Sequence, residues 1–494
     1  MNTYIFTRCG EINMIKLART IIRKLPLLAL ILLLYIIIGA TVPFAFQPDV
    51  SEAYSESINE DDFFGCNETV DRVMLLETNE SALDERIRLI NMAKQRIILS
   101  TFDFRADESG KDMMAVLLNA ADRGINVKIL VDGFSSMLYM DNNPYFIALS
   151  CHPNIEIKIY NRINLLKPWT IQGRMHDKYL LVDDIGYILG GRNTYDLFLG
   201  NYETKHGNYD RDVLVYNTSS KTDAGKDSSL YRLEEYFNAI WALDICTLYY
   251  DNESLALREN VSSRIMELKE RYDGIRSNKS NLFCEYSYDE VTYPTKKITL
   301  LSNPTGIYSK EPRVYHSLIR LMKNADENVV LHSPYVVCNE TMYRDLSDIC
   351  RMVPDVRMVI NSVTNGSNPF TTSDYARNKD DLIKTGIDIY EYDGGRSYHA
   401  KTILIDDELS IIGSFNFDMR STYIDTELML VIDSRELNEE LKYHMGQIEK
   451  DCRMVIDKDT YYYPEDLEVA EMTLRKKILV KALSTLLIPF RHLI

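Results

Sequence analysis

Two segments of the chain place a histidine two positions before a lysine. They are "MHDKYLLVDDIGYILGGRN" (residues 175–193) and "SYHAKTILIDDELSIIGSFN" (residues 397–416). Both fit the pattern HxKx4Dx6G(G/S)xN. The pattern positions are His176, Lys178, Asp183, Gly190, Gly191 and Asn193 in the first copy, and His399, Lys401, Asp406, Gly413, Ser414 and Asn416 in the second. Because residues i and i+2 of a strand point to the same side, each copy puts an imidazole beside an ammonium group.

These side chains suit the chemistry of a phosphodiester. An imidazole with a pKa near 6.5 serves as a nucleophile or a proton donor at neutral pH. If the two copies face each other, one histidine can attack phosphorus while the other protonates the leaving alkoxide. The lysines would stabilise charge on the phosphate oxygens, so this scheme needs no metal. We expect further phosphate contacts from Asn193, Ser414 and Asn416.

A single HxKx4D segment is a weak signal, because a surface His-Lys pair explains it equally well. Two copies with the same step to a glycine pair and an asparagine are a much stronger one. The copies lie about 220 residues apart, so the repeated unit has the size of a domain.

Alternating strands and helices precede each copy in the same order. The patterns predict strands at 96–104, 126–133 and 154–161 in the first half, with a helix at 111–122. The second half repeats this with strands at 328–336, 355–362 and 386–393, and a helix at about 374–385. The sequence therefore predicts an α/β fold of duplicated domains, each a mixed, mostly parallel sheet flanked by helices. A pseudo-two-fold arrangement would bring the two copies together across one cleft.

The length of 494 residues also favours two domains. We expect the following order: a cytoplasmic N-terminus (1–24), a transmembrane helix (25–46), a linker (47–75), a first domain (76–250), a connecting segment (251–297), a second domain (298–457) and a basic amphipathic tail (458–494).

The membrane helix is predicted from 22 consecutive uncharged residues, 25–46, which as a helix span roughly 33 Å. Basic residues precede this run and acidic residues follow it, which predicts a single-pass protein of the cell membrane with its body outside the cytoplasm. A cleaved signal peptide is the alternative, although the run is longer than usual for one. Seven of the eight cysteines follow the run without a CxxC pair, and such free cysteines are more typical of a reducing cytoplasm.

The net charge and the basic C-terminal segment indicate which binding partners to expect. The formal net charge of −17 argues against a nucleic-acid partner, which normally requires a basic surface. The C-terminal stretch "RKKILVKALSTLLIPFRHLI" (residues 475–494) combines basic and apolar residues, which is typical of a segment lying on anionic lipid. A helix packed on the body of the protein is the alternative.

The doubled motif resembles the phospholipase D superfamily, and most closely the bacterial cardiolipin synthases. The resemblance runs from about residue 79 to 457 and rests on "GGRN" (190–193), "RDVLV" (211–215), "GSFNFDMRS" (413–421) and "DTELMLV" (425–431). It implies a covalent phosphohistidine intermediate and no metal or other cofactor. It also implies that His176 is the nucleophile and His399 the general acid and later the base, although pseudo-symmetry leaves the reverse assignment open.

Two further carboxylates are expected to orient the imidazoles. Glu427 starts the strand "ELMLVID", and Asp212 is predicted to hold the matching place in "DVLVYN". The motif aspartates Asp183 and Asp406 belong to the candidate catalytic set, but a structural role is the favoured interpretation for both. Gly191 replaces the serine found at position 414, so the two half-sites are predicted to differ.

Three functions remain open. The first is a phosphatidyltransferase of the cardiolipin synthase type, acting on phospholipid, with phosphatidylglycerol the expected substrate. The second is a phospholipase D that uses water as the acceptor and releases phosphatidic acid, since one fold hosts both reactions. The third is a membrane-tethered nuclease or a silent binding module, which the acidic charge and the two complete motifs disfavour.

Overall fold

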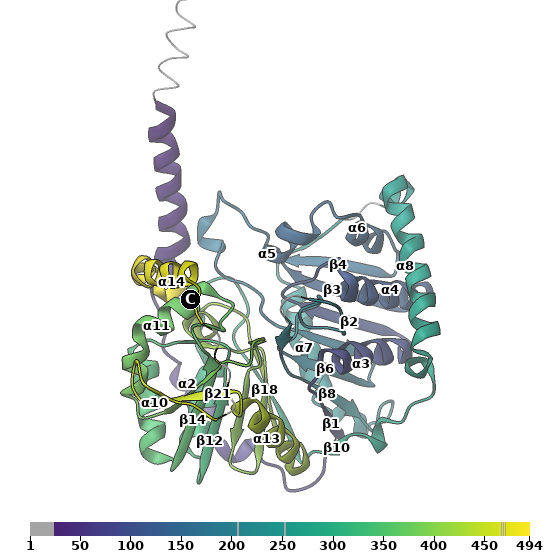
Figure 1. Ribbon diagram of the computed structural model, residues 1–494. Coiled ribbons are helices and arrows are strands. Elements are labelled where there is room, and N and C mark those ends of the chain that lie inside the picture. Colours follow the sequence, from purple (N-terminus) through teal and green to yellow (C-terminus); the bar gives the residue numbers. More distant parts are fainter. Residues whose placement is uncertain (1–23, 205–206, 251–252, 466, 468, 470) are drawn as a thin grey trace, which may run out of the picture.

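An apolar helix projects from a two-lobed body in the computed structural model (Figure 1). The structure describes residues 24–204, 207–250, 253–465, 467, 469 and 471–494. The predicted cytoplasmic N-terminus lies outside these residues except for its last position, Lys24. The projecting helix, Lys24–Phe44, is long and apolar enough to cross a membrane, and 6% of its most apolar window is buried.

Each lobe is built on a nine-stranded sheet. The strands of the first sheet are β1 (Asp71–Leu76), β2 (Arg96–Thr101), β3 (Asn126–Asp132), β4 (Ile155–Tyr160), β5 (Tyr179–Val182), β6 (Gly186–Gly190), β8 (Asp212–Asn217), β9 (Cys246–Leu248) and β10 (Tyr293–Pro294). Those of the second are β11 (Lys297–Ser302), β12 (Asn328–His332), β14 (Asp355–Asn361), β15 (Asp388–Tyr392), β17 (Thr402–Ile405), β18 (Leu409–Gly413), β20 (Leu428–Asp433), β21 (Cys452–Val455) and β22 (Tyr461–Tyr462). The predicted strands correspond to β2, β3 and β4, and to β12, β14 and β15.

The two sheets have the same strand order. Neighbouring strands of the first sheet follow the order β1-β8-β6-β5-β2-β3-β4-β9. The equivalent order in the second sheet is β11-β20-β18-β17-β12-β14-β15-β21. This confirms duplicated α/β domains with mixed sheets. The expected predominance of parallel pairs was wrong, because within each described sheet only β2-β3-β4 or β12-β14-β15 run parallel. Tight turns join β5 to β6 and β17 to β18, and such connections make antiparallel pairs.

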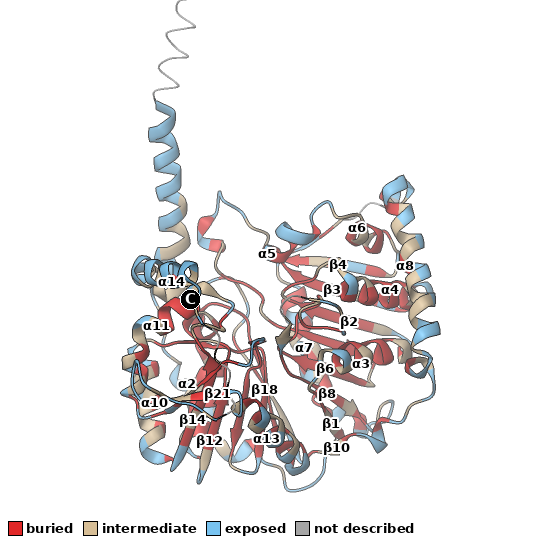
Figure 2. Ribbon diagram, viewed as in Figure 1, coloured by how far each residue is buried: buried red, intermediate tan, exposed pale blue. Residues whose placement is uncertain are grey.

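Helices cover the outer face of each sheet and also fill the space between the sheets. The outer helices of the first lobe are α3 (Asn79–Met92), α4 (Glu108–Asp122), α6 (Pro144–Ser150) and α8 (Glu259–Asn278); those of the second are α9 (Arg313–Lys323), α10 (Glu340–Met352) and α11 (Pro369–Ile383). On the inner side, α7 (Leu230–Trp241) and α13 (Arg435–Glu449) share one core with both sheets. Strands β5, β17 and β20 are buried along their whole length, which explains their largely apolar sequences. Strands β6 and β18 are also buried throughout (Figure 2).

The two lobes are joined by backbone contacts beside the histidine motifs. Strand β7 (Asn208–Tyr209) of the first lobe pairs in parallel with β16 (Ser397–Tyr398) of the second. A second bridge joins Met175 to Thr426. Each bridge is within one residue of a motif histidine or its carboxylate partner, so the lobe interface fixes both motif segments.

Some predicted connections contribute to the lobes. Strand β1 begins within the predicted linker, and β10 lies within the predicted connecting segment, which also supplies α8 against α4 and α6. In the tail, α14 (Leu474–Leu486) packs on α11, but Val480 is its one buried residue. The tail ends in a 3-10 helix, η9 (Ile488–Leu493). Four of the seven cysteines from Cys66 onward are buried.

Candidate active site

Each HxK segment ends where a short hairpin begins. His176 and Lys178 immediately precede β5, and His399 and Lys401 immediately precede β17. The turns of these hairpins are closed by Asp183 and Asp406, which adopt positive φ angles of 48° and 51°. Aspartate tolerates this left-handed conformation better than most residues, which suits it to both turns.

The motif aspartates do not contact an imidazole. Asp183 accepts hydrogen bonds from the backbone N–H groups of Lys94, Gln95 and Arg96 at 2.6, 2.9 and 2.7 Å. Asp406 accepts the equivalent bonds from residues 326, 327 and 328 at 3.0, 2.9 and 2.8 Å. Both carboxylates therefore tie a hairpin turn to the start of the neighbouring strand. They lie outside the candidate catalytic set and have the structural role that the sequence analysis favoured.

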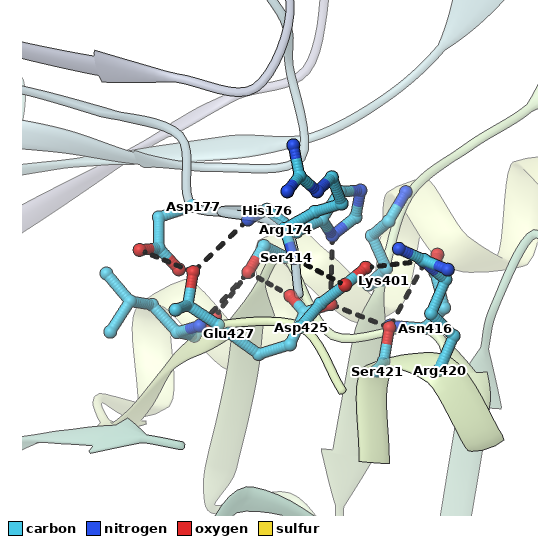
Figure 3. Close-up of polar contacts among 12 residues, drawn as sticks. Arg174, His176, Asp177, Lys401, Ser414, Asn416, Arg420, Ser421, Asp425 and Glu427 are labelled. Atoms are coloured by element: carbon cyan, nitrogen blue, oxygen red, sulfur yellow. Dashed lines mark hydrogen bonds and ion pairs between the residues drawn. The ribbon is translucent and has the colours of Figure 1, made fainter. Parts of the chain in front are cut away.

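Each motif histidine is bonded to a carboxylate from the other lobe. His176 Nδ1 lies 2.9 Å from Glu427 Oε1 (Figure 3), and His399 Nδ1 lies 2.6 Å from Asp210 Oδ2. With the Nδ1 proton shared with a carboxylate, the Nε2 lone pair is left for chemistry. The backbone N–H of His176 also donates to the hydroxyl of Thr426 at 3.2 Å. The imidazoles are thus oriented only when both lobes are in place.

The predicted role of Asp212 was wrong. Its carboxylate accepts bonds from the side chain of Arg86 at 2.9 Å and from the backbone N–H of Arg192 at 3.2 Å. The sheet register explains the error, because Gly190 pairs with Asp212 whereas the equivalent Gly413 pairs with Met429. The counterpart of Glu427 is therefore two residues earlier, at Asp210.

Ser414 also has a different role from the predicted one. Its hydroxyl donates to Glu427 Oε2, and Ser421 donates to Glu427 Oε1 at 2.6 Å, so both serines hold the carboxylate rather than a substrate (Figure 3). At the equivalent Gly191, an added Cβ would lie 2.1 Å from Asp210 Oδ1. The aspartate occupies the space that the serine fills in the second half-site, so the two half-sites are indeed different.

The lysines are buried against their own histidines. Lys178 and Lys401 are each 2% exposed, and each Nζ donates to the backbone carbonyl of its motif histidine. Lys401 Nζ also lies 2.7 Å from His399 Nδ1 and 3.3 Å from Nε2. Positive charge is therefore concentrated beside the ring nitrogens.

Burial and neighbouring charge shift the pKa values of these groups. Burial and the charge of Lys401 lower the pKa of His399 to about 4, against the opposing effect of Asp210. Burial and the charge of Lys178 likewise hold the pKa of His176 well below its usual value. Burial opposes the ionisation of Asp210, yet the charges of Lys401 and His399 lower its pKa to about 2. Both imidazoles are thus neutral near pH 7 when no anion is bound, and a bound phosphate would raise their pKa values.

Glu427 differs from Asp210 in its electrostatic setting. Burial raises the pKa of Glu427 to about 8, and the charge of Lys178 offsets this only in part. Burial also lowers the pKa of Lys178 to about 8 and that of Lys401 to about 7. Asp210, beside His399, is therefore firmly ionised at neutral pH. Glu427, beside His176, keeps its proton part of the time.

Both histidines line one cavity of about 440 Å³. Asn193 and Asn416, the asparagines expected to contact phosphate, also line it, and the buried Oδ1 of Asn416 has no partner among the described residues. Two arginines that the sequence analysis missed, Arg174 and Arg420, add positive charge to the wall. Asp425 accepts a bond from Arg420 at 2.9 Å and one from the backbone N–H of Arg174 at 3.3 Å (Figure 3). Such a wall suits an anion.

Aromatic and apolar side chains complete the cavity. Phe102 lines the cavity and packs edge-on to His176 at 5.5 Å between ring centroids. Phe198, which does not line this cavity, packs likewise on His399 at 5.0 Å. Leu493 and Ile494 of the tail also reach the cavity wall. In the described part of the chain, no three His, Cys, Asp or Glu side chains are grouped so as to hold a metal ion.

Comparisons with known proteins agree with this architecture. Residues 87–241 and 318–448 match the family described as "Cardiolipin synthase, PLD-like domain". The chain is 28% identical over 402 residues to cardiolipin synthase C of Escherichia coli, covering 73% of this chain and 81% of that protein. It is also 26% identical over 434 residues to an uncharacterised protein of Helicobacter pylori, covering 79% and 81% of the two chains.

A solved structure shares the fold. The crystal structure of phosphatidylserine synthase from Haemophilus influenzae aligns with a TM-score of 0.60 at 15% identity, over 85% of this chain and 95% of that one. The family match covers more than half of the chain, in the two lobes that carry the paired histidines. The chain therefore belongs to the family with the cardiolipin synthase type of phospholipase D-like domain, and it is an enzyme of the phospholipase D superfamily.

Proposed function

We propose that this enzyme is a membrane-bound phosphatidyltransferase of the cardiolipin synthase type. It moves a phosphatidyl group from one phosphatidylglycerol to another and releases glycerol. The observation that carries the proposal is that two imidazoles from different lobes line one cavity, each with its Nδ1 bonded to a carboxylate of the opposite lobe. The match to cardiolipin synthases supports the same substrate class.

The first step transfers the phosphatidyl group to the enzyme. His176 Nε2 attacks phosphorus, the bond from phosphorus to the glycerol oxygen breaks, and His399 gives its proton to that oxygen. The anionic phosphodiester raises the pKa of His399 and so favours the protonated form that this step requires. Lys178, Lys401, Asn193 and Asn416 stabilise the charge on the remaining phosphate oxygens.

The second step reverses these roles. The hydroxyl of the acceptor lipid loses its proton to His399, its oxygen bonds to phosphorus, and the bond from phosphorus to His176 Nε2 breaks. One phosphodiester is exchanged for another, so the reaction requires neither a nucleotide nor a redox partner.

The position of the cavity beside the apolar helix supports membrane attachment. The loop that follows β4 supplies Ile163 and Ile171 to the cavity, and its Leu166 carbonyl accepts a bond of 2.8 Å from Tyr35 of the helix Lys24–Phe44. His492 Nε2 in η9 lies 3.1 Å from the carbonyl of Thr41, next to the cavity-lining Leu493. Two segments of the cavity wall thus touch the membrane-proximal helix, as access to a lipid substrate would require.

Exposed apolar residues also lie near the end of the helix Lys24–Phe44 that meets the body of the protein. Leu165 and Leu166 are 56% and 77% exposed, and Leu474, Ile478 and Leu486 of α14 are exposed beside basic residues of the same helix. Figure 1 shows α14 at the foot of the projecting helix, and Figure 2 shows its largely exposed surface. We propose that this surface lies on anionic lipid and that the body is outside the cytoplasm. Protease protection of intact vesicles tests the orientation.

A lipid assay tests the proposed function. Detergent-solubilised enzyme is incubated with labelled phosphatidylglycerol and the products are separated. We expect cardiolipin and glycerol; phosphatidic acid would indicate a phospholipase D instead, and no change would contradict both. His176→Ala and His399→Ala should each abolish turnover, whereas His444→Ala, on α13 with Glu440 as its nearest carboxylate at 3.9 Å, serves as the control.

A further inference from the structure

A second cavity meets the candidate active site at one histidine only. It has a volume of about 710 Å³, and it shares Asn193, Tyr335 and His399 with the first cavity. His176 lines the first cavity but not the second. The two histidines therefore differ in the space that each can reach.

We propose that this second cavity binds the hydroxyl-rich alcohol of the reaction, namely the leaving glycerol and then the glycerol headgroup of the acceptor lipid. The inference rests on the proposed function and adds to it a subsite for the acceptor. In an in-line displacement at phosphorus, the nucleophile and the leaving group lie on opposite sides. The returning acceptor takes the path of the leaving group in reverse, so both alcohols occupy the side of the proton-transferring histidine. A cavity that touches His399 alone fits that requirement.

The second cavity has polar groups with unused hydrogen-bonding capacity. Lys476 of α14 donates to the carbonyls of Thr364 and Gly366 at 2.6 and 2.8 Å, and a lysine ammonium carries three donors. The Asn365 amide nitrogen donates to Asn361 Oδ1 at 3.0 Å and to the Arg396 carbonyl at 2.7 Å. Within the described chain, its Oδ1 accepts no hydrogen bond. A free donor and a free acceptor are thus available to adjacent hydroxyl groups.

The wall of the first cavity adds apolar side chains to the charged groups around the histidines. Phe102, Phe134, Ile163, Ile171, Phe370 and Leu493 line it. Such side chains suit the glycerol backbone and acyl chains of a phosphatidyl group rather than a polyol. An acceptor subsite in the second cavity also gives the tail a function, because α14 brings Lys476 to it.

Headgroup exchange with soluble alcohols tests the subsite. Full-length enzyme in detergent micelles is given phosphatidylglycerol with either radiolabelled glycerol or radiolabelled ethanol, and the label that enters lipid is measured. Ethanol presents one hydroxyl and cannot use the additional polar groups. We expect Lys476→Met and Asn365→Leu to raise the KM for glycerol by about tenfold, as expected for one lost hydrogen bond to a charged or buried group. The change for ethanol should be at least fivefold smaller.

A matched control comes from the same helix. Lys481→Met alters another lysine of α14, which lines a separate cavity away from His399, and should leave the KM for glycerol unchanged. Equal effects of Lys476→Met on glycerol and ethanol, or no effect on either, would overturn the subsite while leaving the proposed function standing. A wild-type enzyme that releases phosphatidic acid but incorporates neither alcohol would contradict the proposed function itself, and the subsite with it.

Discussion

Glu427 Oε1 of the second lobe lies 2.9 Å from His176 Nδ1 of the first, although 251 positions separate the two residues in the sequence. Asp210 and His399 form the reciprocal pair at 2.6 Å. Each half of the duplicated chain thus supplies one catalytic histidine. It also supplies the carboxylate that orients the histidine of the other half. The paired site can exist only in the assembled two-lobed protein.

Replacing either carboxylate by the matching amide should impair turnover without unfolding the protein. In Asp210→Asn and Glu427→Gln, the amide no longer fixes the imidazole tautomer, so we expect kcat to fall by about 10² to 10⁴. The rate of cardiolipin formation and the melting temperature are measured together. Asp212→Asn is the comparison, because Asp212 bonds to Arg86 and the backbone of Arg192 and not to a histidine.

That comparison distinguishes the two aspartates. Asp212→Asn should lower the melting temperature through the loss of a buried ion pair, with kcat of the folded enzyme largely retained. Should Asp212→Asn reduce kcat as strongly as Asp210→Asn at unchanged stability, the assignment of Asp210 as the partner of His399 would be wrong.

The neighbours of His399 should move its pKa in opposite directions. The charge of Lys401 lowers this pKa and that of Asp210 raises it, with a net value of about 4. Lys401→Met removes a positive charge, so the pKa of His399 should rise by about 1 to 3 units. Asp210→Asn removes a negative charge and should lower it further. The pH dependence of carbethoxylation at His399, quantified by mass spectrometry, reports the neutral imidazole; shifts in the same direction in both variants would contradict the geometry.

The turn aspartates should affect stability and not chemistry. Asp406→Asn keeps a residue that tolerates the positive φ of 51° but removes a carboxylate that accepts three backbone bonds. We expect a loss of about 1 to 3 kcal/mol in the free energy of unfolding, measured by denaturation in detergent. Asp407→Ala, at the next position, loses only an exposed contact to Lys442 and should change stability by less than about 1 kcal/mol. Comparable losses in the two variants would argue against the turn role.

The exposed leucines beside the apolar helix should matter only at a lipid surface. The double variant Leu165→Ser and Leu166→Ser should lower the rate severalfold on phosphatidylglycerol in vesicles, because these side chains are proposed to enter the bilayer. It should leave the rate on monomeric short-chain phosphatidylglycerol nearly unchanged. Met352→Ser, at the exposed end of α10, is the control. An equal loss on both substrates would point to a damaged cavity instead of a lost membrane contact.

The sequence predicts the fold and the motif residues well for a physical reason. Spacing within a strand decides which side chains share a face, so His176 with Lys178 and His399 with Lys401 could be paired without a structure. The apolar runs of β2 and β3, and of the equivalent β12 and β14, likewise predict buried strands. The antiparallel remainder of each sheet was underestimated, because the pairing of β8 and β20 depends on contacts distant in sequence.

The rest of the site depends on register and on the lobe interface. Asp210 and Asp212 differ by two positions and share one side of an extended chain, so only the pairing of β6 with β8 separates them. The exchange of carboxylates between lobes, and the approach of Lys476 and Leu493 from the tail, are products of tertiary packing. The first motif has Gly191 where the second has Ser414, and this difference did indicate that the two half-sites differ. Its cause is the space taken by Asp210.

The central claim is that His176 carries the phosphatidyl group between donor and acceptor. Phosphatidylglycerol labelled with radioactive phosphorus is mixed with wild-type enzyme and with His399→Ala, quenched, digested and mapped by mass spectrometry. We predict an acid-labile, alkali-stable label on His176 of the wild-type enzyme, which is much weaker in His399→Ala because the leaving alcohol then lacks its proton donor. Label that maps to another residue, or that persists in His176→Ala, would contradict the account.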